Sequence, residues 1–225
     1  MSDQVPATGT LLEVIPGICW ARMPLPFALN HINLWLLKDS IDGQLGWTVV
    51  DTGIANDETR QAWEALMAIQ LGGLPILRVL VTHMHPDHIG LADWLAQKAS
   101  IPIWMSLSDY SVARWLTSAA GAEKGSQAGG GGAADHFKRH GLCAEDDLTK
   151  IRARAGYYRE MVPSIPVEYV RLMDGDSLKI GQYQWQVIVG YGHAPEHLSF
   201  WSPDLDILIS GDMVLPRIST NVSVY

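Results

Sequence analysis

The first third of the chain carries strand-like hydrophobic patterns. Residues 32–38 and 47–50 form two such runs, and the Asp42-Gly43 pair between them is a turn signal. Residues 76–81 form an almost uninterrupted apolar run. A short apolar run of this kind is typical of a strand that is buried on both faces. The pattern therefore predicts at least three strands before residue 82.

Helix-like patterns lie between and after these strands. Asn56 or Asp57 can cap a helix that Gly72-Gly73 would end, with apolar residues at helical spacing between them. A second helix is expected from about residue 91 to 98, followed by a short strand at 101–105. The order strand, helix, strand predicts a mixed fold in this half of the chain.

Residues 106–163 have a helical pattern with one interruption. The stretch 126–134 is low in complexity and includes four consecutive glycines, so it offers few side chains for a core. We expect residues 121–134 to be a flexible, Gly-rich surface insertion. The acidic residues 145–147 favour the first turn of a helix, which we expect to continue to about Met161.

The last third returns to strand-like runs. Turn signals such as Asp174-Gly175 separate these runs, which lie at residues 167–172, 184–189, 198–201 and 207–210. The chain shows no internal repeat and no clear boundary. We therefore expect residues 1–225 to form a single α+β domain.

Composition narrows the class of protein. Hydrophobic residues make up 48% of the chain and charged residues 18%, which is a globular composition. The net charge is −8 and no basic run is present, which disfavours a nucleic-acid partner. The two cysteines, Cys19 and Cys143, are isolated, so we expect small buried side chains in a reducing compartment. No leader-like or membrane-spanning segment is evident, and we expect a cytoplasmic protein.

Four potential metal ligands lie within six residues at the end of the buried apolar run. They are His83, His85, Asp87 and His88. In an extended chain alternate side chains share a side, so His83 and His85 can converge on one ion. Pro86 keeps the preceding residue extended, and Asp87 and His88 can then face a second position. Burying so many polar groups without a partner would cost several kcal/mol, so the cluster predicts a metal site.

Two later segments supply what such a site still needs. His193 and Asp212 each follow a predicted strand. His193 would complete three imidazoles around one ion and leave a coordination position for water. Asp212 is a carboxylate that can bridge two ions. Each residue alone would be weak evidence for a metal site. Together with the motif at residues 83–88, both become credible ligands.

The order of these motifs resembles that of the metallo-β-lactamase-fold superfamily. The T-H-x-H-x-D-H signature of that family is complete at residues 82–88. An aspartate after a strand (Asp51) precedes it, and a G-H loop (192–193) and a G-D pair (211–212) follow in the family's order. The resemblance spans about residues 32–212. It implies a four-layer αββα sandwich with the metals at one edge of the sheets.

The resemblance also implies a role for each motif residue. One ion would be held by His83, His85 and His193, the second by Asp87 and His88, and Asp212 would bridge the two. Asp51 would orient the ligands from behind, and His197 would support its loop rather than bind metal. An aspartate at position 212 resembles the glyoxalase II, lactonase and RNA-processing branches. Glu196 and His197 depart from the G-H-T-P-G-H loop of glyoxalase II-like members, which weakens a thioesterase assignment.

A site of this kind would perform hydrolysis. Two ions ~3.5–4 Å apart bring the pKa of a shared water to about 7 and so generate a hydroxide. Asp87 would orient that hydroxide and exchange a proton with it, as the catalytic residue. Imidazole with carboxylate favours zinc, then iron or manganese.

We therefore expect a metal-dependent hydrolase of an ester, thioester or lactone of a small molecule. A phosphodiesterase or nuclease of the same fold is the enzymatic alternative, against which the charge of −8 weighs. A non-catalytic metal-binding protein is the alternative from another class. The expected partner is a small-molecule substrate, without nucleic acid or membrane, and a homo-oligomer remains open.

The end of the chain raises a further expectation. Relatives of this motif order usually carry one more histidine ligand after the G-D pair, but no histidine occurs after His197. We expect a fragment of a longer protein, lacking the C-terminal elements of the fold; a lineage with an incomplete second site is the alternative. His136 and His140 are candidate substitutes in a predicted surface helix. The second ion should then be only partly occupied, and an apolar surface should lie exposed near the C-terminus.

Overall fold

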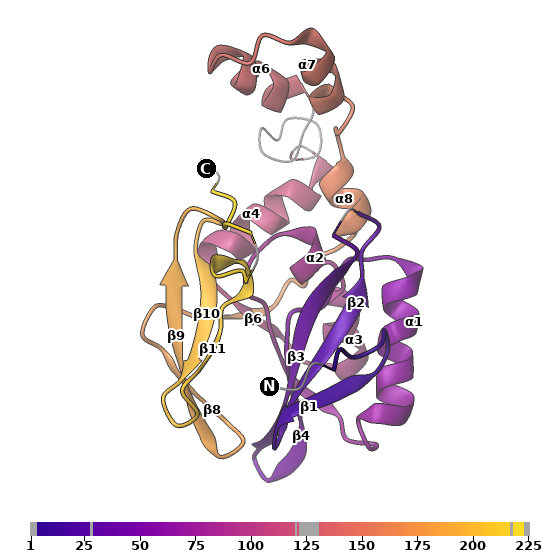
Figure 1. Cartoon of the computed structure of the whole chain (residues 1–225), viewed down its shortest axis with the longest axis vertical. Helices are drawn as coiled ribbons and strands as arrows, with labels where there is room; N and C mark the ends of the chain where they lie inside the picture. The colour runs from indigo at the N-terminus through magenta and orange to yellow at the C-terminus, as the bar shows by residue number, and fades with distance from the viewer. Residues whose placement is uncertain (1–3, 28, 120, 122–130, 217, 223–225) are drawn as a thin grey trace.

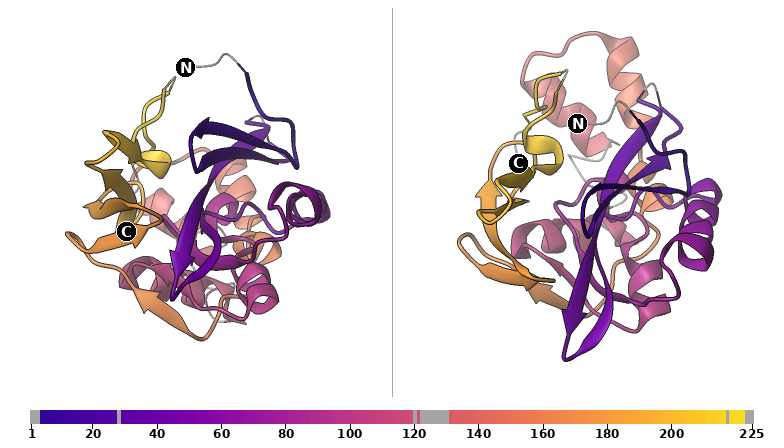
Figure 2. Two further views of the ribbon diagram at one scale, coloured as in Figure 1. Left: turned by 90° about the horizontal axis from the view of Figure 1, so that it is seen from below. Right: turned by 60° about the horizontal axis from the view of Figure 1, so that its bottom comes forward.

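The computed structural model describes residues 4–27, 29–119, 121, 131–216 and 218–222. These residues form two β-sheets that face each other, with helices beyond the larger sheet (Figure 1; Figure 2). The two sheets and their helices are the mixed α+β sandwich that the pattern and the motif order predict.

The larger sheet has seven strands in the order β1-β2-β3-β4-β5-β6-β7. Pairing is antiparallel from β1 to β4 and parallel from β4 to β7. Its strands are β1 (Leu11–Ile15), β2 (Ile18–Pro24), β3 (His31–Ile41), β4 (Gln44–Val50), β5 (Ile76–Leu80), β6 (Ile103–Met105) and β7 (Tyr169–Arg171). The expected turn joins β3 to β4: Asp42 and Gly43 have φ values of 52° and 82°, as a two-residue hairpin turn requires.

The smaller sheet has four antiparallel strands in the order β11-β10-β9-β8. Its strands are β8 (Ser177–Ile180), β9 (Tyr183–Gly190), β10 (His197–Ser202) and β11 (Ile207–Ile209). Strands β1, β2 and β8 were not among the predicted runs. They are short or carry mixed polar residues, so their patterns are weak without the neighbouring strands.

The helices follow the predicted order with two corrections. They are α1 (Asp57–Ala65) with its π-helical continuation η1 (Leu66–Gln70), α2 (Pro86–Ile89), α3 (Ala92–Ala99), α4 (Leu107–Thr117), α6 (Gly131–Arg139), α7 (Glu145–Arg152), α8 (Tyr157–Met161) and the 3₁₀ turn η2 (Gly211–Met213). The helix expected to run to Met161 is broken, because Gly156 has a φ of 79° and separates α7 from α8. Of the expected flexible insertion, residues 122–130 lie outside the described residues, and residues 131–134 begin α6 instead of a loop.

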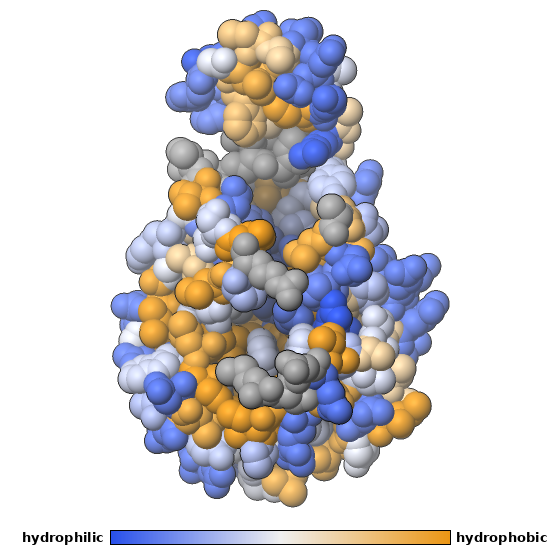
Figure 3. All heavy atoms as spheres, viewed as in Figure 1, coloured by the Kyte–Doolittle hydropathy of each residue, from blue (hydrophilic) through white to orange (hydrophobic). Residues whose placement is uncertain are grey.

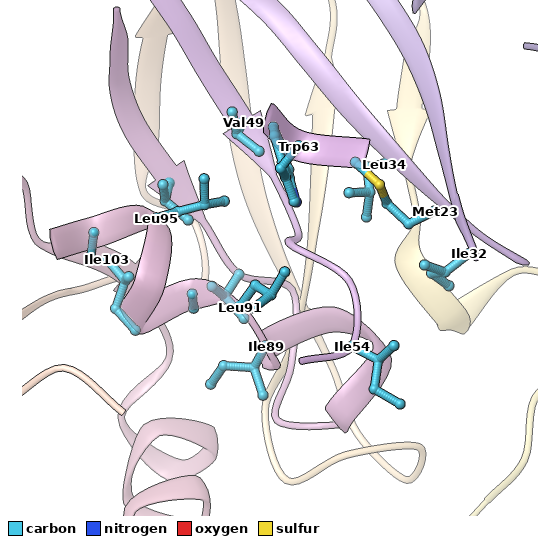
Figure 4. Packing of buried hydrophobic residues seen from close by; sticks show 14 of the residues in the cluster. Met23, Ile32, Leu34, Val49, Ile54, Trp63, Ile89, Leu91, Leu95 and Ile103 are labelled. Carbon is cyan, nitrogen blue, oxygen red and sulfur yellow. The ribbon is translucent and has the colours of Figure 1, made fainter. Parts of the chain in front are cut away.

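Two hydrophobic cores hold these layers together. The larger core fills the space between the seven-stranded sheet and its helices and includes Leu34, Val49, Trp63 and Leu95 (Figure 4). The smaller core lies between the two sheets. Strand β5 contributes to both, since Val79 faces the helices and Leu80 faces the smaller sheet. The prediction of a strand buried on both faces is thereby confirmed.

The outer side of the smaller sheet carries no helical layer within the described residues (Figure 1), and the expected sandwich allowed for missing C-terminal elements. Ile188 and Leu208 are exposed on that side. The expected exposed apolar surface near the C-terminus is also present, at Val214, Ile218 and Val222. Helices α6 and α7 stand apart from the sandwich at the opposite pole from β8 (Figure 1; Figure 3).

Two smaller expectations have mixed outcomes. Cys19 is buried as expected, but Cys143 is exposed, and both thiols are free. No described helix is both long and apolar enough to cross a membrane.

Candidate metal centre

Chain topology brings the predicted motifs to one edge of the sandwich. Because β4 and β5 are parallel, the chain leaves both strands at the same edge, where Asp51 and Thr82 meet. The backbone N–H of Leu198 donates to the carbonyl of Thr82 at 2.8 Å, which fastens β10 of the smaller sheet to the end of β5. The loop before β10 and the turn after β11 therefore reach the segment that follows β5.

Three imidazoles converge at this edge. Nδ1 of His85 lies 2.9 Å from Nε2 of His83 and 3.0 Å from Nε2 of His193. The two Nε2 atoms are themselves 3.1 Å apart. His83 and His193 are buried and His85 is half-buried. The three histidines predicted to share an ion are thus brought together by the fold.

The hydrogen bonds behind two of these rings determine which nitrogen carries the proton. Nδ1 of His193 lies 2.9 Å from the carbonyl oxygen of Asn221, which can only accept, so Nδ1 donates. The Thr82 hydroxyl lies 2.8 Å from Oδ2 of Asp51 and 2.9 Å from Nδ1 of His83. It donates to the carboxylate and accepts from His83. The Nε2 atoms of His83 and His193 therefore carry lone pairs and no protons.

This donor set fits a cation. A ring nitrogen of a neutral imidazole is either a donor or an acceptor, so three converging nitrogens cannot all satisfy one another. The lone pairs of His83 and His193 face each other at 3.1 Å, which is repulsive unless a positive charge lies between them. Ring nitrogens about 2.0–2.1 Å from a tetrahedral ion have a similar mutual spacing. The geometry suits one ion bound by three imidazoles.

A second group adjoins the first through Asp212. One carboxylate oxygen of Asp212, Oδ2, lies 3.4 Å from Nε2 of His193, and the other, Oδ1, lies 3.4 Å from Nε2 of His88. Oδ2 of Asp87 lies 3.6 Å from the same nitrogen of His88. Nε2 of His88 is buried and makes no hydrogen bond within the described part of the chain. Asp212 thus faces both groups, as a bridging ligand must.

Burial and neighbouring charges shift the pKa values of the histidines in the two groups in opposite directions. Burial, reinforced by the neighbouring histidines, lowers the pKa of His85 to about 3 and holds the pKa of His83 well below its usual range. Burial also opposes the charge on His88, but the carboxylates of Asp87 and Asp51 outweigh it and raise the pKa of that imidazole. Burial opposes the charge on Asp212, but the neighbouring His193 and His88 outweigh this effect and lower the pKa of its carboxyl group. Neutral His83 and His85 beside an anionic Asp212 are the protonation states that a bound cation requires, whereas His88 would have to release a proton when it binds one.

Asp51 orients His88 of the second group by bonding to the ring nitrogen that does not face Asp87 and Asp212. Its carboxylate accepts hydrogen bonds from the Thr82 backbone N–H at 2.7 Å and from Nδ1 of His88 at 2.8 Å. The bond to His88 leaves Nε2 of that ring as the atom that faces Asp87 and Asp212. Asp51 has a φ of 65°, a conformation that non-glycine residues adopt rarely and mostly at constrained sites. Its position matches the orienting role that the motif order implies.

His197 lies next to the site without joining either donor group. Its ring stacks on His83, with centroids 4.6 Å apart, and its Nε2 accepts the backbone N–H of Asp212 at 3.1 Å. The side chain therefore holds the η2 turn, and its expected support of its own loop stays a prediction. His136 on α6 and His140 just after its end contact each other and belong to neither donor group.

Sequence reasoning missed two buried residues that contact the site. Asp109 on α4 accepts the backbone N–H groups of Met84 and Glu196, and Tyr158 on α8 donates its hydroxyl to the carbonyl of Met84 at 2.6 Å. The Ser106-x-x-Asp109 spacing signals a helix cap. It carries no information on contacts with segments far along the chain.

Known proteins with similar sequences include hydrolases. The chain is 26% identical over 196 residues to the probable metallo-hydrolase YqgX of Bacillus subtilis, covering 87% of this chain and 71% of the relative. It is also similar to the probable metallo-hydrolase YqjP of the same organism, at 22% identity, with 89% of this chain and 58% of the relative covered.

Solved structures share the fold. A beta-lactamase domain protein from Burkholderia ambifaria is 50% identical and superposes with a TM-score of 0.88, over 100% of this chain and 62% of that protein. A metallo-beta-lactamase family protein from Thermus thermophilus is 24% identical, with a TM-score of 0.70 over 94% of this chain and 64% of that one. The chain thus spans less than two thirds of both proteins.

The family itself is identified by a match along most of the chain. The model of the metallo-beta-lactamase superfamily matches residues 30–224, a range that contains both sheets from β3 onward and every candidate ligand. With the sandwich fold and the convergent histidines, this match establishes that the chain belongs to the metallo-beta-lactamase superfamily.

Proposed function

We propose that this chain carries the active site of a metal-dependent hydrolase. The observation that carries the proposal is the convergence of His83, His85 and His193, whose ring nitrogens lie 2.9–3.1 Å apart. The second Asp212 oxygen and His88 extend this donor set to a second position. Membership of a superfamily that includes metallo-hydrolases supports the same assignment.

The ligand assignment follows the two donor groups. His83, His85 and His193 would hold one divalent ion, Asp87 and His88 a second, and Asp212 would contact both. Imidazole and carboxylate donors favour zinc, with iron and manganese as alternatives. The second position has fewer protein ligands, so we propose that it is the weaker of the two.

The residues around the ions would divide the work of hydrolysis. When bound, the ions supply an activated water and an electrophile that polarises the substrate oxygen. Asp87 is the proposed catalytic residue: its side chain is 25% exposed, so its free oxygen can hold a proton at the open side of the site. Asp51 would keep Nδ1 of His88 protonated and its Nε2 available throughout the reaction.

The proposed substrate is a small carbonyl compound: an ester, thioester or lactone. The formal charge of −8 on the chain would disfavour a polyanion such as RNA. A phosphodiesterase remains the enzymatic alternative, and metal binding without turnover the non-enzymatic one.

A substrate panel under matched metal loading separates these functions. The zinc-loaded protein, its chelator-treated form and His83→Ala would be assayed on chromogenic esters, thioesters, lactones and a model phosphodiester. We expect chelator-sensitive hydrolysis of at least one carbonyl substrate that exceeds phosphodiester cleavage, and no turnover by His83→Ala. Faster phosphodiester cleavage would overturn the substrate class, and tight zinc binding with no turnover would favour a binding protein.

A further inference from the structure

Asp109 connects the two loops that carry the three convergent histidines. Its Oδ1 accepts the backbone N–H of Met84 at 2.9 Å, and its Oδ2 accepts the backbone N–H of Glu196 at 2.7 Å. Met84 stands between His83 and His85, and Glu196 follows His193 by three residues. One fully buried carboxylate, 0% exposed, therefore spans from the segment after β5 to the loop before β10.

The carboxylate is itself held at the start of a helix. Ser106 caps α4 by accepting the Asp109 N–H at 3.4 Å, and its hydroxyl donates back to Oδ2 of Asp109 at 3.2 Å. Glu196 completes a reciprocal pair, because its Oε2 accepts the backbone N–H of Ser108 at 3.1 Å. The helix N-terminus favours both negative charges. The loop before β10 is thus tied to α4 by its backbone and by its side chain.

We propose that Asp109 is a positioning residue for the metal centre. By accepting one backbone N–H from each loop, it sets the spacing at which the imidazoles of His83 and His85 meet that of His193. This inference rests on the proposed metal-binding function of the site. Outer partners that orient metal ligands typically contribute 10- to 100-fold to metal affinity.

Asp109→Asn is the variant that isolates this role. It keeps the volume of the side chain but replaces one acceptor oxygen with an NH₂ group, which would face a backbone N–H of either Met84 or Glu196. Two donors cannot bond each other, so one loop loses its anchor while the helix cap at Ser106 remains.

Asp39→Asn is the matched control. Asp39 is also buried, at 3% exposure, and its Oδ1 also accepts backbone N–H groups from two separated segments, Ser40 at 2.7 Å and Gly181 at 2.9 Å. Asp39 lies on β3 and contacts the β8–β9 turn through Gly181, and that turn is at the opposite end of the sandwich from α2 (Figure 1). The control therefore reproduces the loss of a buried carboxylate without touching a ligand loop.

The experiment measures Co²⁺ binding, because Co²⁺ reports ligand geometry through its visible absorption. Metal affinity from chelator competition, the Co²⁺ spectrum and Tm would be recorded for the parent chain and both variants. We expect Asp109→Asn to weaken the first ion by about 10-fold or more and to alter the spectrum. Asp39→Asn should lower Tm while leaving affinity and spectrum unchanged.

Two outcomes would overturn the inference. One is parental affinity and spectrum in Asp109→Asn; the other is an equal change in both variants, which would reflect general stability. If the parent chain bound no Co²⁺, the proposed function would fail instead. Should Asp109→Asn not fold, Glu196→Ala replaces it, with Glu196→Gln as control because the amide keeps an acceptor for Ser108. Affinity should fall for the alanine variant alone, and equal affinities would also reject the proposal.

Discussion

Nε2 of His197 accepts the backbone N–H of Asp212 at 3.1 Å, and this bond sets where the Asp212 carboxylate lies. The accepting nitrogen must be a lone pair, so the proton of the neutral ring is on Nδ1. The backbone of Asp212 is thereby fixed while its two carboxylate oxygens face His88 and His193. A histidine outside the donor set therefore controls a residue inside it.

His197→Phe should weaken metal binding at the position that Asp212 shares. Phenylalanine keeps a ring against His83 but leaves the Asp212 N–H without its acceptor, a loss of ~1–3 kcal/mol. We expect the second ion to be lost and the first to be retained with lower affinity. Metal content by elemental analysis, with Tm as a check on folding, tests this. Two full equivalents of metal in the variant would contradict it.

His83→Ala should remove the first ion from a protein that stays folded. The change deletes one of the two lone pairs that face each other and so relieves their repulsion in the metal-free state. We expect metal content and hydrolysis to fall to background with the far-UV circular dichroism unchanged. Asp87→Ala should lose the second ion and turnover while keeping the first. His140→Ala, on the exposed end of the α6 segment, is the control and should behave as the parent.

Calorimetric titration of the metal-free chain with zinc should show two unequal sites. Three imidazoles serve the first position, whereas the second draws only on Asp87, His88 and the shared Asp212. We expect at least a roughly 10-fold difference in Kd between them. Two equally tight sites would show that another residue completes the second position.

Gly211→Ala should lower the free energy of unfolding by more than the strain of a positive φ alone explains. Gly211 has a φ of 49°, and an added Cβ would lie 2.6 Å from Cε1 and Nε2 of His197. Gly43→Ala is the control, since Gly43 has a φ of 82° and no atom within 4 Å of an added Cβ. We expect the control to lose about 1–2 kcal/mol of unfolding free energy. Gly211→Ala should lose more and should also lower metal content, because His197 must move. Equal losses measured by urea unfolding would refute the steric argument.

Cys19 should make stability fall as the solution becomes alkaline. Burial, with the charge of Glu13, raises the pKa of its thiol from 9.0 to about 11. Between these values the unfolded chain loses the proton and the folded chain keeps it, so the unfolding free energy decreases as pH rises from 9.0 to about 11. Urea unfolding across this range should show a shallower decline in Cys19→Ala. At neutral pH a thiol reagent should label Cys143, which is exposed, before Cys19.

Local sequence patterns were sufficient to predict the candidate metal ligands and most of the element order. The spacing of His83, His85, Asp87 and His88 after an apolar run is a local feature. In the structure His83 and His85 meet His193, and His88 lies beside Asp87 and Asp212. Local signals also predicted the Asn56 cap of α1 and the hairpin turn before β4. These features depend on residues close in the chain, so pattern and spacing suffice to predict them.

The contacts that hold these candidate ligands in place follow only from the packed fold. The bonds from Asp109 to Met84 and Glu196 join segments 25 and 87 residues away in the chain, and no local pattern encodes such pairs. The same holds for strand β8, which is recognisable once β9 lies beside it. Hydrogen bonds between segments far apart in the sequence form only when the sheets have packed. Packing removes water, so each buried donor and acceptor bonds to the partner that the fold places next to it.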